Sequence, residues 1–221
     1  MRTSLYSYSK INYKCSNNFK YPKMKEITFN QYRSIDVFIL SLLTAVFEFI
    51  AAMATNRWFV LQAMSISIIP AMVCITAFRW GKYAFFPSIV GAFAYCLASK
   101  GTLQQFVVYC LGSAFCLLAI PMLNKIGKEK ARLDFIHRSI FATVVYLSIT
   151  IGRWICSLIF ELSIKSLLPF ILTDVLSLLF AIVVLTLVRN VDGLIEDQKS
   201  YLLRLDRERK EEEQANLNDP F

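Results

Sequence analysis

The sequence predicts an all-α integral membrane protein, a bundle of about six transmembrane helices with both termini in the cytoplasm. Hydrophobic residues make up 56% of the 221-residue chain and charged residues only 18%, whereas soluble domains are close to half apolar and a quarter charged. The apolar residues form blocks about as long as a bilayer is thick. Lysine and arginine gather on alternate loops between these blocks, as they do in membrane proteins.

Six apolar blocks have the length of membrane helices, which need about 20 mostly apolar residues. The blocks are continuous rather than alternating, and this pattern favours helices over the strands of a membrane barrel. The third block is the shortest. The predicted spans are Val37–Thr55, Phe59–Phe78, Tyr83–Ala98, Phe106–Leu123, Ile140–Ile159 and Leu167–Val188.

The spans divide the chain into three regions. Residues 1–35 are polar and basic without a helical or strand period, which predicts a disordered segment. Residues 36–189 are expected to form the six-helix transmembrane domain. Residues 190–221 are expected to form a charged cytoplasmic tail that is partly helical and is separated from the last span by Gly193.

The distribution of basic residues predicts the orientation of the spans. The N-terminal segment, two loops and the C-terminal tail together hold 20 lysine and arginine residues, whereas the loops on the opposite side hold three. Basic loops are retained in the cytoplasm, so we expect a multi-pass protein of the cell membrane. The same asymmetry explains the net charge of +8. We therefore expect the lipid bilayer, rather than nucleic acid, as the partner of the basic residues.

Patterns of known enzymes and metal sites are missing from the sequence. It contains no G-x-S-x-G, H-E-x-x-H or P-loop pattern, so we assign no catalytic residue and do not expect an enzyme. His137 is the single histidine, and none of the six cysteines forms a C-x-x-C pair, so neither a metal site nor a cofactor is expected. A contact between His137 and Asp134 is expected to be a surface contact rather than a catalytic dyad.

Three ionisable residues lie well inside the predicted spans: Glu48, Arg153 and Asp174. Each would cost about 2.5–3.5 kcal/mol at the centre of a membrane helix if it stayed unpaired, so each is expected to face the bundle interior. Counted along their spans, all three lie at a similar depth, slightly outside the midplane. Polar side chains, including Thr150 and Tyr109, continue along the faces of neighbouring helical turns.

The residues alone leave two interpretations of this polar cluster open. In the first, the polar stripes line a pocket that opens outward and binds a small molecule. In the second, an Arg153–Asp174 or Arg153–Glu48 ion pair only fixes the helices against one another. One pair can also serve both purposes.

Short motifs make the chain resemble a known family of membrane proteins. Arg79-Trp80-Gly81, followed by a short span that contains Gly91, resembles the turn between the second and third helices of S components. These proteins are the substrate-binding membrane subunits of energy-coupling factor transporters. Ser41 and Ala45 have the small-x-x-x-small spacing that this family uses on its first helix to meet a coupling protein.

The resemblance extends over about Gln31 to Lys199 and implies a function. S components catch a vitamin or another micronutrient near the outer face, in a pocket lined mainly by the last three helices. They then associate with a transmembrane coupling protein and two cytoplasmic ATPases. By this resemblance Arg153 holds an anionic group of the ligand, and Asp174 and Glu48 orient Arg153 or meet a cationic group. The other expected ligand-binding residues are Tyr109 and Trp154, as stacking rings, and Thr150.

Two other classes of function stay open. A structural or assembly membrane protein would use its basic loops and charged tail to recruit a cytoplasmic partner. A membrane-embedded enzyme is the third class. A pocket with a bound small molecule favours the transport function, whereas a sealed bundle with a docking tail favours the assembly function.

Overall fold

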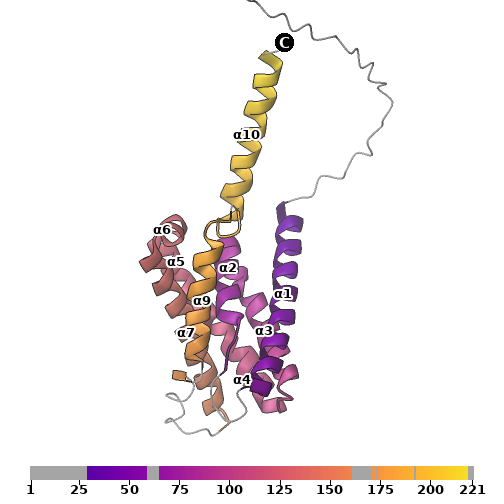
Figure 1. The fold of residues 1–221 in the computed structure, drawn as a ribbon, viewed down its shortest axis with the longest axis vertical. Coiled ribbons are helices and arrows are strands. Elements are labelled where there is room, and N and C mark those ends of the chain that lie inside the picture. The colour runs from indigo at the N-terminus through magenta and orange to yellow at the C-terminus, as the bar shows by residue number, and fades with distance from the viewer. Residues whose placement is uncertain (1–28, 59–64, 161–170, 173, 192, 219–221) are drawn as a thin grey trace, which may run out of the picture.

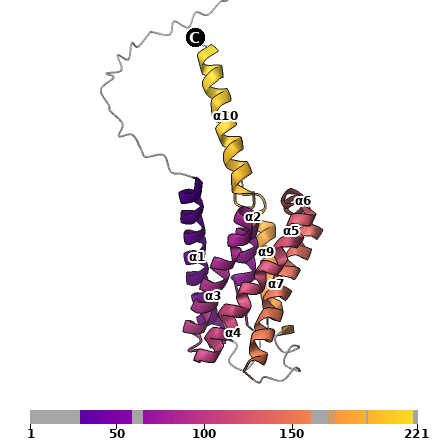
Figure 2. The same cartoon turned by 180° about the vertical axis from the view of Figure 1, so that it is seen from behind.

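A computed structural model of the chain shows a bundle of helices from which one charged helix projects (Figures 1 and 2). Helices are the only regular secondary structure within the described residues, which confirms the predicted all-α class. Among them, three helical segments are long and apolar enough to cross a membrane by length and composition: Phe29–Arg57, Leu103–Ile126 and Phe135–Leu158. The described residues are 29–58, 65–160, 171–172, 174–191 and 193–218.

Helix α1 (Phe29–Trp58) begins earlier than the sequence predicts. Residues 29–35 were expected to be disordered but form its first turns, and residues 1–28 lie outside the described part of the chain. The early start has a packing cause. The ring of Trp80 lies 5.6 Å from that of Phe29 and 6.0 Å from that of Tyr32. These contacts supply the tertiary packing that a polar helical turn needs in order to form.

Helix α2 (Ile69–Trp80) corrects the second predicted span. Residues 65–68 are not helical, and residues 59–64 lie outside the described residues. Pro70 stands in the first turn of α2, where its missing N–H leaves no helical hydrogen bond unmade. The 12 residues of α2 reach about 18 Å, against a hydrocarbon core of about 30 Å. All of them are buried, so α2 is the central helix of the bundle.

A 3-10 turn, η1 (Gly81–Ala84), reverses the chain after α2 and leads into an apolar hairpin. Gly81 has a φ of 58°, a conformation that glycine adopts without the strain of a side chain. The hairpin matches the third and fourth predicted spans within a few residues. Its elements are α3 (Phe85–Ala98), α4 (Leu103–Ala114), η2 (Phe115–Ala119) and α5 (Ile120–Ile126).

The second half of the bundle contains one long and one short apolar helix. Helix α6 (Lys128–Leu133) joins α5 to α7 (Phe135–Leu158), which agrees with the fifth predicted span. The sixth predicted span is broken, because Asp174 lies in a turn and α9 begins only at Val175 (Val175–Val188). Residues 161–170 lie outside the described residues. The 14 residues of α9 reach about 21 Å.

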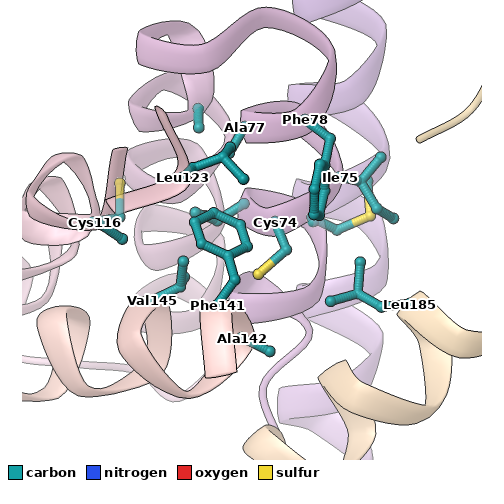
Figure 3. Close-up of a cluster of buried hydrophobic side chains, with 14 of the residues drawn as sticks. Cys74, Ile75, Ala77, Phe78, Cys116, Leu123, Phe141, Ala142, Val145 and Leu185 are labelled. Carbon is teal, nitrogen blue, oxygen red and sulfur yellow. The ribbon is translucent and has the colours of Figure 1, made fainter. Parts of the chain in front are cut away.

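The hydrophobic core surrounds α2, as Figure 3 shows. The ring of Phe78 on α2 meets that of Phe141 on α7 edge-on, with their centroids 5.3 Å apart. Cys74 lies beside this pair, while Leu123 closes the core from α5 and Leu185 closes it from α9. These contacts fix α7 and α9 against the central helix.

Helix α10 (Gln198–Asn218) projects from the end of the bundle at which α1 begins (Figure 1). Its base is fixed by Arg79, which pairs with Asp36 at 2.8 Å and donates to the carbonyl oxygen of Gly193 at 2.8 Å. Gly193, predicted to separate the tail from the last span, has a φ of 72°. Gln198 donates to the same carbonyl at 2.6 Å. Arg79 therefore connects α1, α2 and the tail.

Candidate functional site

Helices α4 and α7 cross at two glycines. A Cβ atom placed on Gly112 would lie 2.5 Å from the Cα atom of Arg153, and one placed on Gly152 would collide with the carbonyl oxygen of Gly112. Backbones this close require residues without a side chain. The crossing turns Arg153 toward the interior of the bundle, where the residue is 4% exposed.

The guanidinium of Arg153 contacts two residues of α4 and the residue that precedes α9. Its Nη1 donates to Oδ2 of Asp174 at 2.9 Å, and its Nη2 donates to Oγ of Ser113 at 3.4 Å. Its Cζ atom lies 4.7 Å from the ring centroid of Tyr109. A cation at this position over an aromatic ring is attracted by the electrons of its face. The structure thus confirms that Arg153 faces inward and lies beside Asp174.

Asp174 is the residue that precedes α9, and its second oxygen is also engaged. Oδ1 accepts a hydrogen bond from the hydroxyl of Ser65, in the non-helical segment before α2. Two residues later, the N–H of Ser67 donates to Oγ of Ser177 at 2.8 Å. These bonds join residues 65–68 to the first turn of α9 and give polar partners to the irregular backbone.

Glu48 lies at the start of α2 instead of pairing with Arg153. Its side chain is fully buried, and its Oε2 accepts a hydrogen bond from the N–H of Ile68 at 2.7 Å. The first N–H groups of a helix lack partners within the helix and carry partial positive charge. Glu48 therefore satisfies the amino-terminal end of α2 and is held by it.

Helices α2 and α9, which are both short and apolar, thus begin beside one another in the bundle interior. They pack against each other, and a carboxylate stands at each start, Glu48 at α2 and Asp174 at α9. Non-helical backbone at membrane depth occurs where it is buried in protein or lines a cavity. Helix starts that converge within a membrane bundle in this way form the binding sites of many transporters.

The other residues expected to bind ligand are placed unequally. Tyr109 lies against Arg153 and stacks on Tyr95, with ring centroids 5.1 Å apart and planes inclined by 22°. Trp154 is half-buried, and its Nε1 has no hydrogen-bond partner within the described residues. The hydroxyl of Thr150 donates a hydrogen bond of 2.9 Å to the carbonyl oxygen of Tyr146, one turn earlier in the same helix. This hydroxyl proton is therefore already engaged.

Three contributors to the site were not among the predicted residues. Tyr95 is one of several aromatic residues in apolar stretches, and Ser65 lies inside what the sequence presents as a continuous span. Ser113 belongs to the polar face of the fourth predicted span, which also contains Tyr109, so the helical spacing gave a signal for it. No comparable signal marks Ser65, because its role depends on the interruption before α2.

The expected partner-binding pair on α1 is only partly available. Ser41 is 7% exposed, and its hydroxyl donates to the carbonyl oxygen of Val37 at 2.8 Å. It is buried because α1 and α3 are packed closely, so that a Cβ atom on Gly91 would lie 2.9 Å from the methyl group of Thr44. Ala45 is half-buried and can still meet another helix.

Asp134 and His137 are in contact, and the structure gives Asp134 a structural role. It is the N-cap residue of α7, where its Oδ1 accepts a hydrogen bond from the N–H of Ile136 at 3.1 Å. The hydrogen bond from His137, followed by that from Ile136, lowers the pKa of Asp134 below its ordinary value. Carboxylates at this position stabilise the start of a helix.

No family model, curated protein or solved structure matches this chain. Arginine has five N–H donors, and Nε of Arg153 has no hydrogen-bond partner within the described residues. The guanidinium has donors left for an anionic oxygen, and two stacked tyrosine rings lie next to it.

Proposed function

We propose that the protein is the substrate-capturing membrane subunit of a micronutrient importer, similar to the S component of an energy-coupling factor transporter. The proposal rests chiefly on the Arg153–Asp174 pair, which is buried where α2 and α9 begin. Burial of charge in a membrane bundle is costly and usually marks a substrate or ion site. In this proposal the protein performs no catalysis, and the cytoplasmic ATPases supply the energy.

In the proposed binding step, Arg153 meets an anionic group of the ligand. Its Nη1 is bound by Asp174, and Nε and part of Nη2 remain for a carboxylate or phosphate oxygen. Tyr109 and Tyr95 offer the face of a stacked aromatic pair to a ring on the same molecule. Asp174 holds the guanidinium in a fixed orientation before the ligand arrives.

The proposed topology has six spans and cytoplasmic termini. It is supported by the location of the start of α1, the α5–α6 connection and α10 at one end of the bundle in Figure 1. Most basic residues belong to these segments, while Arg57 and Lys100 belong to the opposite end. Arg153 lies near the C-terminal end of α7, which is the outer end in this topology.

The proposed partner of α1 is a transmembrane coupling protein that approaches at Ala45. The neighbouring exposed side chains Leu42, Val46 and Phe49 leave one apolar face of α1 uncovered. Ala45→Leu should reduce co-purification with a coupling protein, because a bulky side chain holds the partner helix away. Leu43→Ala, a neighbouring exposed position, serves as the control. Equal co-purification of the two variants would remove this surface from the proposal.

The direct test of ligand capture is the thermal stability of the purified protein against a panel of micronutrient-sized molecules grouped by charge. A ligand present at about 100 times its Kd stabilises the folded state by about 2.7 kcal/mol. We expect an anionic molecule with a ring to raise the melting temperature of the wild type and of Arg57→Lys, an exposed control. The same molecule should have little effect on Arg153→Lys, because lysine cannot form the two parallel bonds of a guanidinium. Failure of every anionic molecule to stabilise the wild type would contradict the proposal.

The second candidate function, assembly of a cytoplasmic partner, is favoured by α10. This helix stands clear of the bundle (Figure 2), and its sequence is rich in charged residues. If α10 is the functional surface, removing residues 198–218 abolishes partner recruitment and leaves no ligand effect to measure. If ligand capture is the function, ligand-induced stabilisation survives this deletion.

A further inference from the structure

A lateral groove of about 350 Å³ runs between α1 and α3, away from the Arg153 site. Its walls are mainly apolar, with Val37 and Phe38 on α1 and Phe86 and Val90 on α3. Phe38 is 68% exposed and Phe86 is 44% exposed. Because α1 has the length and composition of a membrane span, the groove opens toward the hydrocarbon of the bilayer.

One end of the groove is basic and aromatic. The Cζ atom of Arg33 lies 4.4 Å from the ring centroid of Tyr83, and Nζ of Lys82 lies 5.7 Å from the same centroid. Arg33 and Tyr83 both line the groove. Neither Arg33 nor Lys82 forms an ion pair within the described residues, and the nearby Asp36 is already engaged by Arg79 and Trp80.

We infer that this groove binds an anionic phospholipid from the leaflet on the α10 side of the bundle. The phosphate lies at Arg33 and Lys82, and one acyl chain lies along Val37, Phe38 and Val90. The inference does not depend on the Arg153 site or on the proposed transport function.

Two features of the groove favour a lipid over other occupants. The charged and apolar parts of the groove follow one another as the headgroup and acyl chains of a phospholipid do. Cations and a tyrosine lie at the end where α1 begins, and apolar walls continue along the span. Basic residues at a membrane surface attract anionic headgroups, and tyrosine is common at the same level.

The test is native mass spectrometry of the full-length protein in detergent with added lipid. The probes are phosphatidylglycerol and phosphatidylcholine with identical acyl chains. Each basic residue near an anionic lipid contributes about fivefold in affinity, so Arg33→Gln with Lys82→Gln should weaken phosphatidylglycerol binding by about 30-fold. The matched control, Arg57→Gln with Lys100→Gln, removes two cations from the opposite end and should bind as the wild type does.

A third variant tests the groove itself. Val90→Trp fills the apolar wall and should reduce binding of both lipids, while the melting temperature without added lipid verifies that each variant is folded. Equal wild-type affinity for the two lipids would overturn the inference, as would equal losses in the two double variants. Protein dimers that Val90→Trp abolishes, without lipid adducts on the wild type, would assign the groove to a second copy and also overturn it.

Discussion

Arg153 and Asp174 form a 2.9 Å ion pair between α7 and the residue that precedes α9, and their side chains are 5% and 15% exposed. The same carboxylate accepts a hydrogen bond from Ser65 before α2. One acidic residue thus connects the membrane-length helix α7 to the starts of α2 and α9. A ligand that binds Arg153 would act at the point where these helices meet.

Replacement of Arg153 should separate the contribution of charge from that of geometry. Arg153→Ala leaves Asp174 buried without its cation and should destabilise the fold by about 3–5 kcal/mol. Arg153→Lys keeps the charge and should cost less. Chemical unfolding in detergent measures both values, with Arg57→Ala as an exposed control. Equal stability of Arg153→Ala and the control would show that the pair contributes nothing to the bundle.

The glycine crossing should tolerate no side chain on α4. Gly112→Ala places a methyl group against the backbone of Arg153, so we expect a loss of about 1–3 kcal/mol from overpacking. Gly91→Ala is the comparison variant, because its new methyl group meets side-chain atoms of Ile69 and Thr44 rather than backbone atoms. A larger loss in Gly91→Ala than in Gly112→Ala would contradict this account of the crossing.

The helical class, the approximate positions of α1, α3 and α7, and the break at Gly193 could be predicted from the sequence. The interruptions before α2 and α9 could not, because they lie inside apolar stretches. Hydropathy measures whether side chains suit a bilayer and is insensitive to whether the backbone is helical. Ser65 and Pro70 are compatible with either state, and tertiary hydrogen bonds to Asp174 and Ser177 select the interrupted one.

Arg79 should hold the base of the C-terminal tail, around Gly193, against α1 and α2. Arg79→Ala removes the pairing with Asp36 and the bond to the carbonyl oxygen of Gly193, so we expect faster proteolysis near residue 193 with the bundle intact. Limited proteolysis followed by mass spectrometry measures this change. Arg207→Ala, on the exposed part of α10, is the control. Identical cleavage rates at residue 193 would exclude a holding role for Arg79.

The N-cap of α7 predicts a dependence of stability on pH. The pKa of Asp134 is lowered in the folded protein, first by His137 and then by the N–H of Ile136. The contribution of Asp134 to the stability of the fold is therefore complete above its pKa in the unfolded chain, about 4. It is lost as the pH falls through the pKa of Asp134 in the folded protein. Asp134→Ala should lower the melting temperature at pH 7, and the difference should shrink below about pH 4. A difference that stays constant over this range would contradict the electrostatic role; Glu129→Ala is the control.

The orientation of the bundle can be measured with reporter fusions. We expect a fusion at Ser99 to report the outer side and fusions at Lys128 and Phe221 to report the cytoplasm, because basic residues gather in the segments near the last two positions. Lys165, also expected outside, lies outside the described residues. An outer location for Lys128 would reverse the bundle and place Arg153 near the cytoplasmic face.

The candidate site was predictable in part because charge inside a span is rare and conspicuous. Arg153, Asp174 and Tyr109 lie together as expected. Glu48 instead caps α2, and Thr150 bonds within its own helix. Helical spacing places residues on a face and at a depth but does not specify which of two carboxylates an arginine will meet. Here Glu48 is engaged by the N–H of Ile68 before α2, and Arg153 meets Asp174 before α9.

Mass spectrometry of small molecules released from the purified protein is the sharpest test of ligand binding at Arg153. The wild-type protein and Arg57→Lys, purified from cells grown in rich medium and then denatured, should release the same anionic small molecule in near-stoichiometric amounts. Folded Arg153→Lys should release much less of it, because the guanidinium no longer holds the anionic group. If the wild type releases no such molecule, or if Arg153→Lys releases as much as the wild type, the Arg153–Asp174 centre is not a ligand-binding site.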